Sequence, residues 1–194
     1  MNSASKKAIL VVSFGTSYEN TRKLTIEAIE HDIADAFPAC PTYRAWTSKM
    51  IIAKLKKRDS LTIHTVKEAL EQMLLDGITD VIVQPTHVIN GIENDQMKAD
   101  ALSFRDRFSS IVFGNPLLTT EEDNQAIVRV VADEFRDMDP DTALVLMGHG
   151  TEHYANTVYA ALDYRFKDTG HKNIFLGTVE AYPALDSLLR AADS

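Results

Sequence analysis

The sequence predicts an α/β protein with parallel sheets that are covered by helices on both faces. Three observations support this fold class. Short, wholly apolar runs such as Ala8–Val12 are typical of strands that are buried on both sides. Longer amphipathic stretches separate these runs, as expected when helices connect parallel strands. Part of the second half of the chain also repeats the pattern of the first half.

The first half contains the elements of one complete sheet. A strand over 8–12 ends in the turn Ser13–Ser17, where Thr16 or Ser17 is the expected N-cap of the next helix. Proline ends one predicted helix, and Gly77 is the expected C-terminal glycine of another. The remaining elements are helix 19–37, strand 42–46, helix 48–57, helix 65–76, strand 80–84, helix 94–108 and strand 110–113.

The pattern breaks around Gly114–Thr120, which we interpret as a domain junction. The predicted domains are therefore an N-terminal α/β domain over 1–117 and a partial C-terminal α/β domain over 118–194. The second domain contains fewer strands than the first. Its predicted elements are helix 121–138, strand 142–147, helix 152–166, strand 174–179 and a final helix through Arg190.

An internal repeat relates the two halves. Val11–Thr21 aligns with Val145–Thr157, so that Gly15 is paired with Gly150, and a second pairing matches Arg44–Thr47 with Glu180–Pro183. In this alignment the strand over 80–84 has no counterpart in the second half. The second sheet is therefore expected to be incomplete: it docks on the first sheet, is completed by another chain, or belongs to a longer protein.

Composition narrows the classes of function. The chain has 194 residues, a formal net charge of −8, 45% hydrophobic and 25% charged residues, which is typical of a globular protein. The acidic balance argues against nucleic-acid binding. Cys40 is the only cysteine, which excludes an intramolecular disulfide and multi-cysteine metal clusters. The sequence contains neither a signal-like nor a membrane-spanning apolar run, and we expect a soluble cytoplasmic protein with no membrane partner.

His149 and Glu180 are the strongest candidates for chemistry. His149 lies between two glycines directly after a predicted strand, and Glu180 follows the next strand. Ligands of open α/β sheets bind at the carboxyl ends of strands, and an imidazole with a carboxylate suits Co²⁺, Ni²⁺, Fe²⁺ or Zn²⁺. Two protein ligands need a third group or substrate nitrogens to complete a site. The alternatives are a histidine bonded to a loop carbonyl and a glutamate that caps the helix after Pro183.

The first half offers weaker candidates at the corresponding strand ends. His87 is either a ligand-binding residue or a half-buried histidine with satisfied hydrogen bonds. The turn Ser13–Ser17 could hold an anion through backbone N–H groups, but its glycine spacing matches no Walker or dinucleotide-binding loop. His153 is either a support for His149 or a solvated helix residue. The sequence also lacks the Gly-x-Ser-x-Gly motif of serine hydrolases.

Several of these segments together resemble a known family. Leu10–Tyr18, Arg44–Ser48, His87–Gly91, Val145–Gly150 and Val179–Pro183 occur in the same order in the anaerobic sirohydrochlorin cobaltochelatases. These enzymes belong to the class II chelatase superfamily, which also includes the ferrochelatases. The resemblance extends over residues 7–189, nearly the whole chain.

The resemblance implies a fold, a reaction and a set of site residues. The fold is chelatase-like, with two similar three-layer α/β/α domains around a tetrapyrrole, and the reaction inserts Co²⁺ into sirohydrochlorin in anaerobic cobalamin (vitamin B12) biosynthesis. Such an enzyme is an ATP-independent metal chelatase of the lyase class that needs no nucleotide. His149 corresponds to a metal ligand and base and Glu180 to a second ligand, whereas the family's third ligand, a later histidine, has no match in this sequence. The implied tetrapyrrole-binding residues are Ser13, Phe14, Gly15, Thr16, His87 and Gly150.

The resemblance leaves specificity and assembly open. Iron or nickel insertion into the same tetrapyrrole, or a truncated module that binds a tetrapyrrole or metal without catalysis, are the alternatives. A homo-oligomer is compatible with the sequence. Sirohydrochlorin carries carboxylates around its rim, and no lysine or arginine partner for them can be assigned from the sequence.

Overall fold

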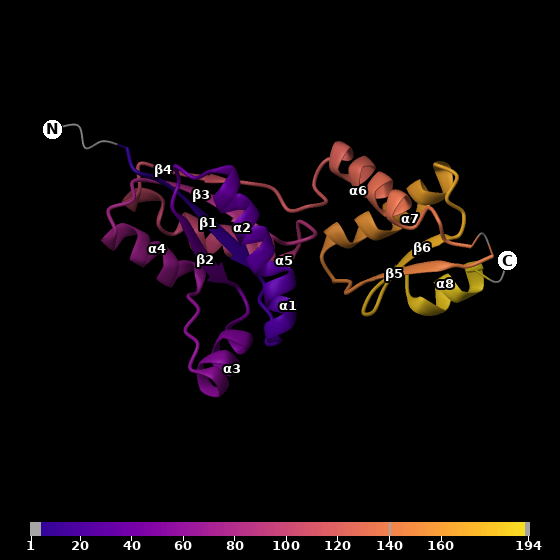
Figure 1. Cartoon of the computed structure of the whole chain (residues 1–194), viewed down its shortest axis with the longest axis horizontal. Helices are drawn as coiled ribbons and strands as arrows, with labels where there is room; N and C mark the ends of the chain where they lie inside the picture. Colours follow the sequence, from indigo (N-terminus) through magenta and orange to yellow (C-terminus); the bar gives the residue numbers. More distant parts are fainter. Residues whose placement is uncertain (1–4, 140, 193–194) are drawn as a thin grey trace. The chain divides into compact units, whose positions relative to one another are not determined.

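The computed structural model describes residues 5–139 and 141–192 and divides into two compact units (Figure 1). Unit 1 spans Met1–Leu117 and unit 2 spans Leu118–Ser194. Each unit has its own parallel sheet and its own helices. Within the described residues, none of the helices is long and apolar enough to cross a membrane.

Unit 1 is built on a four-stranded parallel sheet with the strand order β2-β1-β3-β4. Its strands are β1 (Lys7–Ser13), β2 (Thr42–Trp46), β3 (Asp80–Pro85) and β4 (Ser110–Phe113). Its helices are α1 (Glu19–Leu24), α2 (Ile26–Ala36), α3 (Lys49–Asp59), α4 (Val66–Leu75) and α5 (Ile92–Leu102), with a short 3-10 turn, η1 (Arg105–Arg107).

The central strand β1 fixes the edge at which the loops of unit 1 meet. Val12 lies opposite Ala45 on β2 and opposite Pro85 on β3, so the three strands end at the same edge of the sheet. Backbone hydrogen bonds continue past the strands, from Thr47 N to Ser13 O at 3.0 Å. This carboxyl edge therefore gathers the loops after β1, β2 and β3, which contain the candidate residues of the first half.

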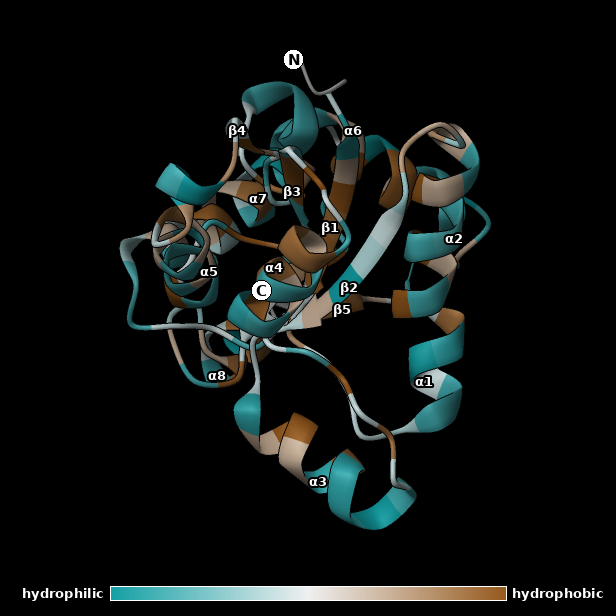
Figure 2. Ribbon diagram, turned by 90° about the vertical axis from the view of Figure 1, so that its left-hand side faces the viewer, coloured by the Kyte–Doolittle hydropathy of each residue, from teal (hydrophilic) through white to brown (hydrophobic). Residues whose placement is uncertain are grey.

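Both faces of the central strand β1 are buried. Alternate residues of β1, including Leu10 and Val12, pack with residues of α4 and α5 in one apolar cluster, while Ile9 and Val11 are also buried on the other face. Figure 2 shows most of β1 in hydrophobic colours, whereas β2 is paler and partly hydrophilic. Because each fully buried side chain of this kind contributes roughly 1.5–3 kcal/mol, the apolar runs read from the sequence hold the unit together.

Helix α3 packs on a separate, smaller cluster. Ser48 is its N-cap and accepts a hydrogen bond from Ile51 N at 3.4 Å. Leu55 is the buried residue of the helix and contacts Trp46, while Ile51 and Ile52 pack beside it. The remaining helix surface is exposed, and Figure 2 shows its C-terminal half in hydrophilic colours.

Unit 2 contains a two-stranded parallel sheet, β5-β6, with Gly148 opposite Thr178. Strand β6 is buried along its whole length, whereas Val145 and Met147 of β5 are 37% and 43% exposed. Helices α7 and α8 both contact β6. The elements are α6 (Glu121–Glu134), β5 (Leu144–Gly148), the 3-10 turn η2 (Tyr154–Asn156), α7 (Thr157–Asp168), β6 (Ile174–Thr178) and α8 (Leu185–Ala192).

The structure corrects the predicted helix over 19–37. It is two helices, α1 and α2, which meet at Thr25 with φ −123° and ψ −74°. The Thr25 hydroxyl donates to Thr21 O at 2.7 Å, a local side-chain bond of the kind that disturbs helices. The predicted N-cap at Thr16 or Ser17 is also wrong, because Tyr18 holds this position and makes no side-chain cap bond.

Other differences concern element ends. The predicted helix 94–108 begins at Ile92 and ends at Leu102, and the chain then forms η1. The predicted helix 152–166 is divided into η2 and α7, and β5 begins at Leu144 rather than at residue 142. Strands β2 and β4 begin and end at the predicted residues.

Candidate metal centre

Two glycines shape the loop that presents His149. His149 follows the last residue of β5, Gly148. A Cβ at Gly148 would lie 2.5 Å from the Tyr159 ring, and a Cβ at Gly150 would lie 2.9 Å from Ala181 N. Gly150 also has a φ of +85°, which L-residues rarely adopt. The chain therefore packs tightly on both sides of the imidazole without a side chain to cover it.

Backbone hydrogen bonds place Glu180 beside His149. Strand β6 ends at Thr178, but Val179 N donates to Gly148 O at 3.0 Å and Glu180 N donates to His149 O at 2.9 Å. The parallel ladder thus continues for two residues beyond the sheet. It sets His149 and Glu180 side by side at the carboxyl edge of unit 2.

The two side chains converge. His149 Nδ1 lies 3.8 Å from Glu180 Oε2, and the side chains are 77% and 65% exposed. An exposed pair at this distance stabilises a protein by about 0–1 kcal/mol, so stability gives little reason to hold these groups together. His149 Nδ1 also lies 3.1 Å from Gly150 O. The tautomer of His149 decides which ring nitrogen, Nδ1 or Nε2, has the free lone pair.

The donor set suits a borderline divalent cation. An imidazole nitrogen and a carboxylate oxygen bind Co²⁺, Ni²⁺, Fe²⁺ and Zn²⁺, with geometry and supply deciding among them. Within 5–139 and 141–192, no three His, Cys, Asp or Glu side chains are grouped so as to hold a metal ion. His149 and Glu180 therefore leave most of the coordination sphere of a bound ion to other groups.

Exposed apolar and aromatic side chains lie close to this pair in the sequence. Tyr154, Val179 and Tyr182 are 77%, 69% and 71% exposed, although side chains of this size are usually buried. Exposed apolar side chains that gather beside polar ligands are typical of a binding surface. A large planar ligand fits the chemistry of such side chains better than a hydrated ion alone.

Sequence reasoning missed the role of Asn156. Its Oδ1 accepts a hydrogen bond from Thr151 N at 3.1 Å, and its Nδ2 donates to Tyr182 O at 2.6 Å. Asn156 thus joins the loop after His149 to the loop after Glu180. The internal repeat contained the signal, since Asn20-Thr21 matches Asn156-Thr157 when one residue is skipped after the Gly15–Gly150 pair. His153, by contrast, is the N-cap of η2, where its Nδ1 accepts from Ala155 N.

The candidate residues of unit 1 fall into two groups. Phe14 is 46% exposed and Thr16 is partly exposed, so both are accessible at the carboxyl edge. Gly15 has φ +103°, and a Cβ there would lie 2.5 Å from Trp46. Ser13 is 1% exposed, and its hydroxyl accepts a hydrogen bond from Thr86 at 2.8 Å. The structure therefore turns Ser13 inward, away from any ligand at this edge.

His87 is also turned inward. Neither ring nitrogen is exposed, and neither has a hydrogen-bond partner among the described residues. Burial lowers the pKa of His87, because the charged imidazolium is disfavoured there. The expected alternative of a satisfied half-buried histidine is thus wrong about its hydrogen bonds, and contact of His87 with a ligand stays a prediction. The anion site at Ser13–Ser17 also stays a prediction, since α1 has only six residues.

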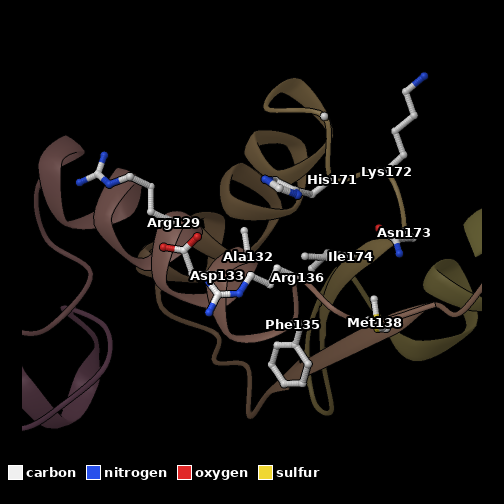
Figure 3. A pocket seen from close by; sticks show the side chains of 11 residues that line it. Arg129, Ala132, Asp133, Phe135, Arg136, Met138, His171, Lys172, Asn173 and Ile174 are labelled. Carbon is white, nitrogen blue, oxygen red and sulfur yellow. The ribbon is translucent and has the colours of Figure 1, made fainter. Parts of the chain in front are cut away.

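A separate hollow in unit 2 lies away from this pair. It has a volume of about 640 Å³ and lies between the C-terminal part of α6 and the start of β6 (Figure 3). Asn173 and Ile174 line it at the amino end of β6, whereas Glu180 follows the carboxyl end. The hollow is therefore not part of the candidate metal centre.

The fold and the pair together define a class of protein. A parallel α/β fold that presents an imidazole and a carboxylate together at the carboxyl ends of two strands is that of a metal-handling α/β protein. The family model described as cobalt chelatase (CbiK) matches residues 7–194. The chain belongs to this family of metal chelatases.

Two curated relatives agree with this assignment. The chain is 37% identical over 184 residues to the sirohydrochlorin cobaltochelatase of Salmonella typhimurium, covering 95% of this chain and 69% of the relative. It is 31% identical over 191 residues to the sirohydrochlorin cobaltochelatase CbiKC of Nitratidesulfovibrio vulgaris, covering 95% of this chain and 65% of the relative. The chain thus spans about two thirds of the length of each relative. The resemblance read from the sequence motifs is confirmed.

Proposed function

We propose that this chain takes part in the insertion of Co²⁺ into sirohydrochlorin, with His149 and Glu180 as ligands of the incoming metal. The observation that carries the proposal is the 3.8 Å approach of His149 Nδ1 to Glu180 Oε2 on two exposed side chains. Both curated relatives are named for this reaction. Cobalt is a substrate in this reaction, and no nucleotide is required.

The chemistry needs a metal that sheds water and a macrocycle that loses its inner pyrrole protons. Glu180 lowers the cost of holding a dication, because its negative charge attracts the metal as water leaves. His149 presents an imidazole that binds the metal or accepts a proton, but one lone pair serves only one role at a time. The macrocycle nitrogens then replace the protein ligands as the ion enters the ring, and the two pyrrole protons pass to the freed imidazole or carboxylate and on to water.

The exposed apolar side chains fit a site in which the metal ligands stay accessible to a large substrate. Tyr154, Val179 and Tyr182 offer a surface on which a flat macrocycle can lie. A site that delivers a metal to a large substrate needs open coordination positions, unlike a closed structural site. The two-ligand arrangement of the described residues meets this need.

The test is cobalt insertion into sirohydrochlorin by the full chain, followed by the absorbance of the metallated product. His149→Ala and Glu180→Gln are expected to reduce insertion by about a hundredfold or more. His171→Ala is the matched control, since His171 lies before the amino end of β6 in the same unit. Insertion at the wild-type rate by both site variants contradicts the proposal.

Metal competition separates the alternatives. The same assay with Fe²⁺ or Ni²⁺ measures specificity, which the ligand types cannot settle because imidazole and carboxylate serve all three ions. Tight tetrapyrrole binding without insertion identifies a binding module instead of an enzyme. The oligomeric state is read from the same preparation by light scattering.

A further inference from the structure

Helix α3 holds an unusual concentration of positive charge. The protein has a net charge of −8, yet α3 carries five of its 20 lysines and arginines within eleven residues. Arg58 is paired with Asp59. Lys54 and Lys57 have no hydrogen-bond or ion-pair partner in the part of the chain that the structure describes. The helix therefore presents free cations on an otherwise acidic molecule.

The free lysines share a face with an exposed apolar side chain. Met50, Lys54 and Lys57 follow each other at spacings of four and three residues, which places them along one side of a helix. Met50 is 77% exposed. These three residues form what we call the α3 row. The opposite side of the helix is occupied, because Leu55 is buried against Trp46.

The α3 row lies beside the carboxyl edge of the unit 1 sheet. Arg58, four residues after Lys54 and on the same side, donates from Nη2 to Ser17 O at 2.7 Å. At the other end of the helix, Ser48 N donates to Phe14 O at 3.2 Å. Both ends of α3 are thus fastened to the loop after β1. Phe14 on this loop is 46% exposed.

The combination matches one kind of ligand. Phe14 and Met50 offer apolar contact to a flat ring, and Lys54 and Lys57 offer charge to anionic groups at its rim. Sirohydrochlorin is a macrocycle of this description, with carboxylates around an apolar centre. We propose that the α3 row, together with Phe14, binds the rim carboxylates and one face of the tetrapyrrole substrate. This inference rests on the proposed function for its ligand, but on different residues.

The same helix provides a matched control. Lys49 and Lys56 lie on another side of α3, where they line a hollow with Thr65 and Glu68. The double variants K54Q/K57Q and K49Q/K56Q remove the same charge from the same helix. They differ only in the side of the helix from which the charge is removed.

Binding is measured with the full chain by porphyrin fluorescence, with uroporphyrin, coproporphyrin and mesoporphyrin as probes. Their rims carry progressively fewer carboxylates. K54Q/K57Q is expected to weaken uroporphyrin binding about two- to twenty-fivefold, because each of the two exposed ion pairs contributes a factor of about 1.5 to 5. The loss is expected to shrink toward mesoporphyrin and to disappear in about 1 M salt. K49Q/K56Q is expected to bind uroporphyrin like the wild type.

Three results would overturn the inference: no uroporphyrin binding by the wild type, equal losses in the two double variants, or the same loss for all three porphyrins. In the cobalt assay, K54Q/K57Q is expected to raise KM for sirohydrochlorin and to leave kcat unchanged, since the lysines hold substrate and not metal. Binding that depends on the α3 row without cobalt insertion would refute the proposed function alone. Normal insertion with no effect of K54Q/K57Q on KM would refute the role of the α3 row alone.

Discussion

Gly150→Ala tests whether close packing of the backbone holds the candidate metal centre together. A methyl group at this position would lie 2.9 Å from Ala181 N and 2.9 Å from Thr178 Cβ. Both atoms belong to the segment that carries Glu180, and neither lies at the end of a flexible side chain. The segment after β6 must therefore move away from the loop after β5.

The expected loss of stability has two parts. The positive φ of Gly150, +85°, costs an alanine about 1–2 kcal/mol. Displacing well-packed neighbours costs about 1–3 kcal/mol more. We therefore expect the free energy of unfolding to fall by about 2–5 kcal/mol in total.

Gly170→Ala is the matched control. Gly170 has a similar φ of +93°, but a Cβ there would meet nothing within 4 Å. This variant is expected to lose only the conformational part, about 1–2 kcal/mol, and to keep its cobalt affinity. Both variants are compared by urea unfolding, and cobalt binding is measured by calorimetry under native conditions.

Cobalt affinity is the decisive measurement. The Glu180 N to His149 O bond of 2.9 Å is expected to break in Gly150→Ala, which separates the two ligands. Their affinity for cobalt is then expected to fall about tenfold or more, as when the support of a metal ligand is removed. Equal losses of stability in the two alanine variants, with unchanged cobalt affinity, would refute this reasoning.

Three further predictions concern stability. Burial lowers the pKa of His87 from its ordinary value of 6.5, so the unfolded chain binds more protons below that pH and the folded protein loses stability on acidification. His87→Phe is expected to remove this loss of stability between about pH 7 and pH 5, as measured by urea titrations. An unchanged pH dependence of stability would count against this prediction. Hydrogen bonds from Ser110 and two other hydroxyl groups lower the pKa of Asp80 from 3.8 to about 2. The ionised Asp80 carboxylate stabilises the folded protein above pH 3.8, and this contribution is lost as the pH falls toward 2. Asp80→Asn is therefore expected to make the free energy of unfolding depend less on pH in this window. The same pH dependence in the variant and the wild type would contradict the prediction. Thr65 and Glu68 form a capping box at the start of α4, so Thr65→Ala is expected to cost about 1 kcal/mol while Thr65→Ser retains most of it, as measured by the urea midpoint.

Strand β1 was predictable because its apolar run is completely buried. Ala8–Val12 is apolar at every position, and all five residues are buried in β1. Helix ends with a side-chain signal were also close to the prediction, as at Thr65 before α4. The break at Thr25 was missed because the amphipathic pattern continues across it, and only the local bond from the Thr25 hydroxyl to Thr21 O marks it.

The candidate site residues also include some whose placement could be predicted from the sequence and some whose side-chain direction could not. His149 and Glu180 were predicted together because strand ends of a parallel sheet share one edge, and the structure places them 3.8 Å apart. Ser13 and His87 follow the same rule along the chain, yet their side chains are turned into unit 1. Position along the chain fixes the edge at which a residue lies, whereas side-chain direction depends on packing that one sequence does not reveal.

The indole of Trp46 lies beneath Gly15, so its fluorescence can report on the loop after β1. Trp46 is the only tryptophan in the sequence, and it is fully buried with its ring where a side chain at residue 15 would lie. All tryptophan emission from this protein therefore originates under that loop. A tetrapyrrole that settles there would accept energy from the indole, so an unlabelled chain reports its own ligand by quenching.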